Sequence, residues 1–212
     1  MKDWCTLAEI LVLAAGGFFL GSVMFSRLLP LWLHKTDVCA DSRDRNPGAA
    51  NVFIHCGWPL GLLCLTLDLF KGFLPVFLAV RLGMFGEWYF AVIAAAPVLG
   101  HAVAPLNGFH GGKCIAAAFG VLLGMLGRTP VVLLLAGLYI LFSTLLKISP
   151  VRRRSILVFT LFGLFGSGFE LYGGHLPSAV GCALISATAA VRHIHAPDAP
   201  AQQDDPLPAE NS

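Results

Sequence analysis

The residues best suited to chemistry stand in polar loops that interrupt a very apolar chain. The first loop, residues 41–51, reads Asp-Ser-Arg-Asp-Arg-Asn-Pro-Gly-Ala-Ala-Asn and stands directly before an apolar segment. Backbone N–H groups at the start of a helix, with arginine side chains beside them, bind anions such as phosphate. The loop is therefore a candidate phosphate site. The alternative is a solvated loop in which Asn51 caps the following helix.

A second loop combines Gly100-His101 with the sequence Gly-Phe-His-Gly-Gly-Lys at residues 108–113. The Gly-Gly pair lets backbone amides approach a ligand, and Lys113 adds a positive charge. The spacing is not that of a nucleotide-binding P-loop, since no Ser or Thr follows the lysine. This pattern fits either an anion site or a turn whose lysine extends to the membrane surface. His101 either transfers a proton or forms a structural hydrogen bond with the neighbouring loop.

A third basic stretch, residues 147–155, contains three consecutive arginines that begin at Arg152. Clustered cations at the end of a membrane helix set its orientation and contact anionic lipid. The other interpretation is that Arg152 contributes to a substrate-phosphate site.

Asp68 and Lys71 stand inside an apolar segment at positions i and i+3, so on a helix their side chains share one face. Charged groups within a membrane are costly, and they usually face the interior of the bundle and mark a functional site. The sequence favours equally a structural ion pair that holds the bundle and a pair that takes part in function.

The composition indicates the setting in which these residues act. Of the 212 residues, 57% are hydrophobic and 12% are charged, whereas soluble domains have about 25% charged residues. The mean hydropathy is +0.77. These values exclude a nucleic-acid binder, a disordered protein and an ordinary soluble enzyme, and they favour a polytopic membrane protein. The six cysteines show neither a CxxC pair nor metal-ligand spacing with histidine, so we expect no metal site and no disulfide framework.

The apolar segments predict an all-α bundle of transmembrane helices. About seven segments can be counted, although six or eight also fit: residues 7–33, 52–80, 88–105, 115–126, 130–146, 155–169 and 177–191. A perpendicular span needs about 20 residues, so the fourth segment is short and could be partly re-entrant. We expect residues 1–195 to form one membrane domain and residues 196–212, rich in Pro, Ala, Asp and Gln, to form a disordered cytoplasmic tail.

The placement of Lys and Arg predicts the orientation of the bundle. With the N-terminus outside, nine cations face the cytoplasm: Lys35, Arg43, Arg45, Lys113, Lys147, Arg152, Arg153, Arg154 and Arg192. Three cations lie on the other side, namely Lys2, Arg81 and Arg128. This asymmetry follows the positive-inside rule and places all the polar loops described above in the cytoplasm.

Taken in order, these stretches resemble the bacterial membrane acyltransferases that transfer an acyl group from acyl phosphate to sn-glycerol 3-phosphate. The matching stretches are Gly21-Ser22, residues 46–53, residues 67–76, Gly100-His101, residues 108–113, Gly120 and Arg192-His193. They cover the chain from about residue 18 to residue 193. No single stretch is decisive, but the ordered set is much more specific than any of its members.

The resemblance implies a phospholipid-synthesis enzyme in the bacterial plasma membrane, with acyl phosphate and glycerol 3-phosphate as substrates and lysophosphatidate as product. It implies no cofactor, no covalent acyl-enzyme and direct attack of the acceptor hydroxyl on the acyl carbonyl. It assigns catalytic roles to Ser42, His101 and Lys113. Phosphate binding falls to Arg43, Arg45, Asn46, Gly111, Gly112 and Arg152. Membrane lipid is the other expected partner, and the resemblance leaves the oligomeric state open.

The chain departs from the family pattern at several of these positions. The family's first loop usually reads Ser-Gly-Ser-Gly-Asn, whereas this chain has Ser-Arg-Asp-Arg-Asn at residues 42–46. In the second motif, Cys114 replaces the glycine that follows the lysine. The chain therefore resembles a divergent member of this acyltransferase family. The alternative function is a catalytically altered or inactive paralogue that binds another phosphorylated small molecule or lipid.

Overall fold

The computed structural model describes residues 2–42 and 44–195, and for residues 2–5 it describes the backbone alone. All the regular secondary structure of the described residues is helical, and none of these residues forms a strand, as the sequence predicts. The elements are α1 (Lys2–Ser22), α2 (Phe25–His34), α3 (Val38–Asp41), α4 (Ala49–Cys56), α5 (Trp58–Arg81), η1 (Met84–Gly86), α6 (Phe90–Val103), η2 (Pro105–Asn107), α7 (Ile115–Gly124), α8 (Val131–Ile140), the π-helical turn η3 (Leu141–Leu145), α9 (Val151–Tyr172) and α10 (Leu176–Ile194).

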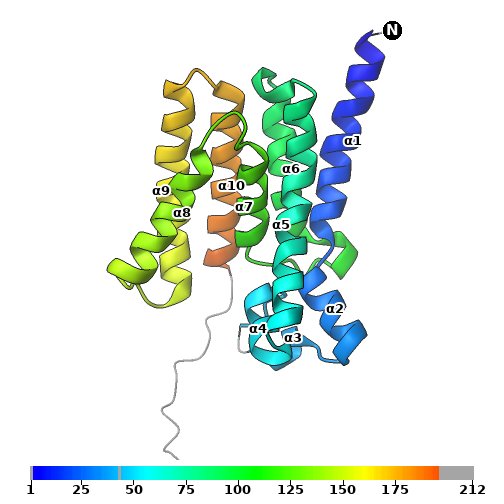
Figure 1. Cartoon of the computed structure of the whole chain (residues 1–212), viewed down its shortest axis with the longest axis vertical. Helices are drawn as coiled ribbons and strands as arrows, with labels where there is room; N and C mark the ends of the chain where they lie inside the picture. Colours follow the sequence, from blue (N-terminus) through cyan, green and yellow to red (C-terminus); the bar gives the residue numbers. More distant parts are fainter. Residues whose placement is uncertain (1, 43, 196–212) are drawn as a thin grey trace, which may run out of the picture.

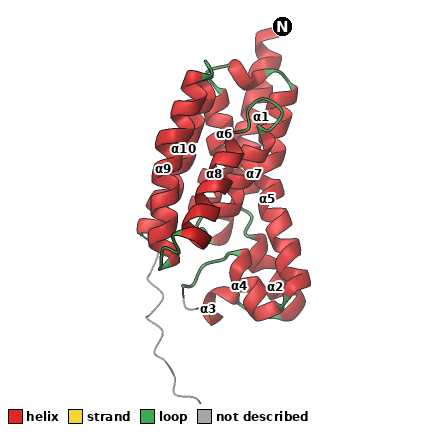
Figure 2. Ribbon diagram, turned by 60° about the vertical axis from the view of Figure 1, so that its left-hand side comes forward, coloured by secondary structure: helices red, strands yellow, loops and turns green. Residues whose placement is uncertain are grey.

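The longer helices run side by side along the long axis of the molecule, and successive helices run in opposite directions (Figure 1). The N-terminus lies at one end. The other end gathers α2, α3, α4, the start of α9 and the last turn of α10, and the view in Figure 2 shows the same division. The loops that carry the candidate chemistry therefore share one end of the bundle, which we call the motif end.

The sequence contains about seven apolar segments, but fewer helices of the structure are both long and apolar enough to span a membrane. Within the described residues, 3 helices are long and apolar enough to cross a membrane, or 4 if the bent pair α1 and α2 is one span. Ile115–Gly124 and Val131–Leu145 are apolar but shorter. A helix rises about 1.5 Å per residue, so α7 alone is too short for a hydrocarbon core of about 30 Å. A bundle with seven spans stays a prediction.

Two predicted segments are interrupted where the backbone changes direction. The segment predicted over 7–33 bends by 46° between α1 and α2. The segment predicted over 52–80 divides at Gly57, whose φ of +83° lies in the region that favours glycine. These interruptions separate the short helices α2 and α4 from the long helices α1 and α5, and α3 lies in the loop between α2 and α4.

Small residues let the long helices approach closely. A Cβ on Gly21 or Gly100 would collide with backbone at the α1–α6 contact, and a Cβ on Gly72 or Gly120 would do so between α5 and α7. Such close approach is the usual way in which helices pack inside a membrane. The fully buried core lies between α5, α6, α7, α9 and α10, and includes Val76, Val98, Leu122, Phe159 and Ile185.

Candidate active site

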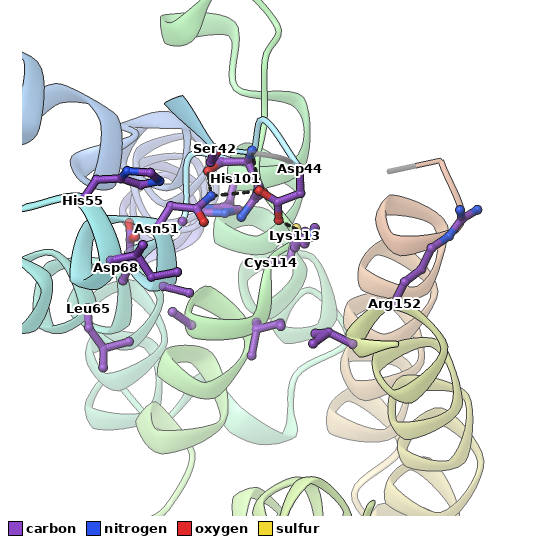
Figure 3. A pocket seen from close by; sticks show the side chains of 18 of the residues that line it. Ser42, Asp44, Asn51, His55, Leu65, Asp68, His101, Lys113, Cys114 and Arg152 are labelled. Carbon is purple, nitrogen blue, oxygen red and sulfur yellow. Dashed lines mark hydrogen bonds and ion pairs between the residues drawn. The ribbon is translucent and has the colours of Figure 1, made fainter. Parts of the chain in front are cut away.

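A cavity of about 1070 Å³ opens at the motif end, between α4, α5, α7 and the start of α9 (Figure 3). Its polar lining includes several residues that the sequence predicts for the site: Ser42, Asn46, Asp68, His101, Lys113 and Arg152. Its apolar lining continues along the helices and includes Leu65, Leu69, Ile115, Phe119 and Val151. One cavity therefore joins a polar, charged end to an apolar groove.

The other predicted residues that the structure describes lie outside the lining of this cavity. Arg45 is exposed and has a φ of 47°, in the left-handed region. Gly111 and Gly112 are not among the lining residues, and Arg43 falls outside the described residues. Lys71 is buried behind Asp68. The predicted phosphate contacts of the arginines and glycines stay predictions.

The first loop is organised around Asp44. Its carboxylate forms an ion pair with Lys113, at 2.6 Å between Nζ and Oδ2. The other carboxylate oxygen accepts hydrogen bonds from Asn51 Nδ2 at 2.9 Å and from the backbone N–H of Asn46 at 3.3 Å. The expectation that Asn51 caps a helix is wrong, because α4 begins at Ala49 after an N-cap at Gly48 and Asn51 lies within its first turn.

The surroundings of Asp44 favour its ionised form. Burial raises the pKa of this carboxyl group, but the hydrogen bonds from Lys113 and Asn51 and the charge of Lys113 outweigh burial, so the pKa is lowered overall. An internal carboxylate thus occupies the donors that an anionic substrate would use.

The second loop packs tightly against the end of α6. The backbone N–H of Gly112 donates to the carbonyl of His101 at 3.1 Å. A Cβ on Gly112 would collide with the imidazole of His101, and a Cβ on Gly111 would collide with the Ala102 carbonyl. The two glycines therefore allow the loop to pack closely against the end of α6. This packing places Lys113 at the cavity.

Arg192, near the end of α10, holds the same loop from the other side. Its guanidinium donates to the carbonyls of Gly111 and Gly112, with 3.2 Å between Nε and the Gly112 oxygen. The sequence marks Arg192 and His193 as a matching pair but assigns them no place in the site. His193 is fully buried and stacks on Phe159 at 6.2 Å between ring centroids.

His101 lines the cavity and is buried, with 4% of its surface exposed. Its Nδ1 atom makes no hydrogen bond within the described residues. A buried polar atom without a partner is uncommon and costly, and such atoms mark sites where a ligand or water is expected. The contact with the neighbouring loop uses the backbone carbonyl of His101, and the ring takes no part in it.

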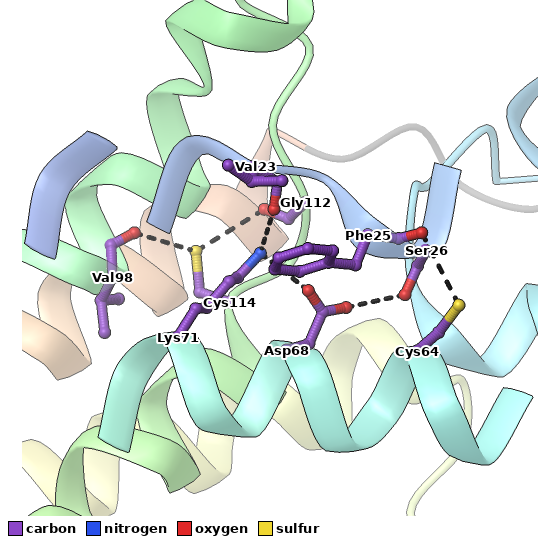
Figure 4. A network of polar contacts seen from close by, with 9 residues as sticks. All are labelled: Val23, Phe25, Ser26, Cys64, Asp68, Lys71, Val98, Gly112 and Cys114. Atoms are coloured by element: carbon purple, nitrogen blue, oxygen red, sulfur yellow. Dashed lines mark hydrogen bonds and ion pairs between the residues drawn. The ribbon is translucent and has the colours of Figure 1, made fainter. Parts of the chain in front are cut away.

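Asp68 and Lys71 form the centre of a buried network at the α1–α2 break (Figure 4). Lys71 Nζ lies 2.7 Å from Asp68 Oδ1 and donates at 2.7 Å to the carbonyl of Val23, in the break. Ser26, in the first turn of α2, donates to Asp68 Oδ2 at 2.7 Å. The pair therefore holds the bend in place, while Asp68 also faces the cavity.

Arg152 stands at the rim of the cavity, in the first turn of α9, and donates to the carbonyl of Ile194 at the end of α10. No group of three or more His, Cys, Asp or Glu residues among those described could hold a metal ion. The polar lining of the cavity combines a lysine, a histidine, carboxylate, hydroxyl and amide groups, with Arg152 at the rim.

The comparison with known proteins identifies the family. The family model described as glycerol-3-phosphate acyltransferase matches residues 11–198. The chain belongs to the glycerol-3-phosphate acyltransferase family. The resemblance seen in the ordered sequence motifs is thereby confirmed.

Curated relatives carry the same name. The glycerol-3-phosphate acyltransferase of Pseudomonas paraeruginosa is 37% identical over 174 residues, which cover 82% of this chain and 88% of the relative. The Myxococcus xanthus enzyme is 42% identical over 107 residues, which cover 50% of this chain and 55% of the relative.

Two crystal structures of PlsY (YgiH), an integral membrane glycerol 3-phosphate acyltransferase, have the same fold as this family member. The glycerol 3-phosphate form matches with a TM-score of 0.73 at 27% identity, covering 87% of this chain and 88% of that chain. The lysophosphatidic acid form matches with a TM-score of 0.71 at 27% identity, covering 87% of each chain. The match shows that the helical bundle is that of an integral membrane protein.

Proposed function

We propose that this membrane glycerol-3-phosphate acyltransferase uses acyl phosphate as its donor, and that transfer takes place in the cavity at the motif end. The observation that carries the proposal is the continuity of the cavity from Lys113 and His101 to the apolar groove along Leu65 and Phe119. Both substrates carry phosphate, and the donor also carries a hydrocarbon chain, so a polar end that holds Lys113 and Arg152, joined to an apolar groove, fits them together.

The reaction has a simple balance of bonds. The acceptor hydroxyl oxygen attacks the acyl carbonyl carbon, a new ester C–O bond forms, and the bond between that carbon and the phosphate oxygen breaks. Inorganic phosphate leaves, and the hydroxyl proton passes to a base. Acyl phosphate is already activated, so positioning of the substrates and stabilisation of charge account for much of the required catalysis.

The described side chains suit these tasks. Lys113 supplies the charge that stabilises the leaving phosphate, after it exchanges Asp44 for the substrate. The unpartnered ring of His101 accepts the hydroxyl proton. Ser42 and Asn46 supply hydrogen bonds at the polar end, and Arg152 adds charge at the rim. These residues require neither a metal ion nor a nucleotide for the steps described.

A reconstituted assay tests the donor and the site together. The purified full chain receives radiolabelled glycerol 3-phosphate with either acyl phosphate or an acyl thioester, and lysophosphatidate is measured. We expect product from acyl phosphate, and we expect Lys113→Met to reduce turnover at least about a hundredfold. The matched control is Lys147→Met, an exposed lysine outside the cavity.

Other outcomes lead to distinct conclusions. Product from the thioester alone would overturn the proposed donor and leave the site intact. Product from neither donor, together with saturable binding of another phosphorylated compound, would favour the catalytically altered paralogue. A parallel variant in which Arg43 and Arg45 both become Gln tests the loop arginines, and unchanged turnover would remove them from the phosphate site.

The orientation belongs to the same proposal. We propose seven spans in the bacterial plasma membrane, an outer N-terminus and a cytoplasmic motif end, with residues 1–195 as one domain. The shared position of the motif loops and their excess of cations support this orientation. Single cysteines at positions 35 and 86, in a cysteine-free background, test it by labelling with a membrane-impermeant reagent. Labelling of position 35 from the outer side would overturn the orientation. The cytoplasmic tail, residues 196–212, lies outside the described residues and stays a prediction.

A further inference from the structure

A second cavity lies at the end of the bundle opposite to the motif end. It has a volume of about 620 Å³ and lies between the last turns of α5 and the turn that follows α7. Its lining consists of Phe73, Phe77, Val80, Arg81, Leu123, Gly124, Leu126, Gly127 and Arg128, and it shares no residue with the cavity proposed as the active site. We call it the distal groove.

Two arginines from separate elements line the distal groove. Arg81 is the last residue of α5, and Arg128 stands in the turn between α7 and α8. Each guanidinium lies over an aromatic ring, at 6.0 Å from the centroid of Phe77 and at 5.3 Å from that of Phe85, respectively. Neither guanidinium forms an ion pair with any residue that the structure describes. Among the described residues, neither positive charge in the distal groove is therefore compensated by an ion pair.

The acidic residues near the groove do not neutralise these arginines. Glu9 and Arg81 line a neighbouring cavity together but form no ion pair within the described residues. Glu170 is fully buried and is engaged by the hydroxyl of Thr129 and by His175 Nδ1 at 3.3 Å. Among the described residues, none therefore supplies a counter-charge to the two arginines of the groove.

The floor of the groove is apolar and accessible. Phe73 and Phe77 stack at 5.0 Å between ring centroids. Leu123 is 37% exposed and Leu126 is 49% exposed. One arginine at the end of a membrane helix is explained by extension of its side chain to the interface. Two arginines that converge on one apolar groove match the amphiphilic shape of a lipid, with an anionic head group and a hydrocarbon chain.

We propose that the distal groove binds one anionic phospholipid, whose phosphate lies between Arg81 and Arg128 and whose acyl chain begins along Phe73, Phe77 and Leu123. The site is separate from the catalytic cavity and does not depend on the proposed donor. The bound lipid would hold the end of α5 and the turn after α7 at the same leaflet, because Arg81 and Arg128 would both contact its head group.

Native mass spectrometry of the purified full chain tests the proposal. The protein is titrated with phosphatidylglycerol or phosphatidylcholine in a non-ionic detergent, with inorganic phosphate as a third ligand. We expect one phosphatidylglycerol to remain bound preferentially, and Arg81→Gln with Arg128→Gln to weaken this binding at least about tenfold. The matched control removes two exposed cations near the motif end, in Lys147→Gln with Arg153→Gln, and should retain the bound lipid.

A second variant blocks the groove and keeps both arginines. Gly127 lines the groove and a Cβ there meets no atom within 4 Å, so Gly127→Trp adds a bulky side chain at the groove without a clash at its Cβ. It should weaken lipid binding while acyl transfer in detergent shows that the variant is folded. Equal binding of the two lipids by the wild type, unchanged binding in the double arginine variant, or displacement of the lipid by millimolar inorganic phosphate would overturn the proposal.

Discussion

Lys113 and Asp44 are 69 residues apart in the chain, and their charged groups lie 2.6 Å apart in the candidate active site. The pair joins the first polar loop to the second. Their side chains are about one-fifth exposed, at 18% and 23%, so solvent reaches the contact. An ion pair of this kind contributes about 1 kcal/mol or less, and an anionic ligand can displace it.

Asp44 should therefore compete with the substrate phosphate for Lys113. Replacement by serine in Asp44→Ser removes the internal carboxylate, and we expect the KM for glycerol 3-phosphate to fall about fivefold, which corresponds to about 1 kcal/mol. Steady-state kinetics measures this change, with Asp41→Asn as the control because Asp41 lines the same cavity without a described ion pair. A raised KM would show instead that Asp44 positions the loop for substrate.

The lowered pKa of Asp44 leads to a prediction about acid. A carboxyl group whose pKa is lower in the folded state stabilises the fold above its unfolded pKa, about 3.9, and this contribution disappears as the pH falls through the folded pKa. The difference in Tm between the wild type and Asp44→Asn should stay constant from pH 5 to pH 8 and shrink below about pH 4. A difference that vanishes near neutral pH would contradict the ion pair.

The buried pair of Asp68 and Lys71 should contribute far more to the fold. Lys71→Met leaves the Asp68 carboxylate buried without its cation and leaves the Val23 carbonyl without its donor. Loss of one partner of a buried pair typically costs 3–5 kcal/mol, so we expect a free energy of unfolding lower by about that amount. Ser26→Ala removes one donor to Asp68, keeps the pair, and should cost about 1 kcal/mol.

A double-mutant cycle separates the pair from its surroundings. The combined variant Asp68→Asn with Lys71→Met should be less destabilised than the sum of the single variants, by about 1–3 kcal/mol. The unfolding free energies can be measured by steric trapping in bicelles. Additive effects would mean that the two charges stabilise the bundle independently.

Patterns along the chain predicted the helical fold, the membrane setting and the family, because each depends on composition or on the local order of residue types. Asp68 and Lys71 were expected on one helix face because their spacing is local. The bend between α1 and α2 was not predicted, since Val23 and Met24 continue the apolar pattern. At the break, Lys71, a residue 48 positions away, donates to the carbonyl of Val23.

The candidate site shows the same division. His101 and Lys113 stood out through residue type, and the structure brings them to one cavity. The link between Asp44 and Lys113 could not be predicted, because a carboxylate in the first loop gives no sign of its distant partner. Arg192 was recognisable as part of a motif. Its hydrogen bonds to the carbonyls of Gly111 and Gly112 could not be predicted, because they join positions about 80 residues apart.

This contact gives the last prediction, that Arg192 positions the lysine loop and does not act through charge alone. Arg192→Lys keeps the positive charge but loses the planar fork that reaches two carbonyls. We expect kcat to fall about tenfold while the KM for glycerol 3-phosphate changes less than twofold, because Lys113 would be misplaced without loss of the cationic field.

Two variants at glycines complete this test of the loop. Gly112→Ala should lower kcat by about tenfold or more, because the added Cβ displaces the imidazole of His101. The control is Gly168→Ala, where a Cβ meets no atom within 4 Å, and its kinetics should match the wild type. Full activity of Arg192→Lys would assign Arg192 an electrostatic role, and full activity of Gly112→Ala would show that His101 does not need its present position.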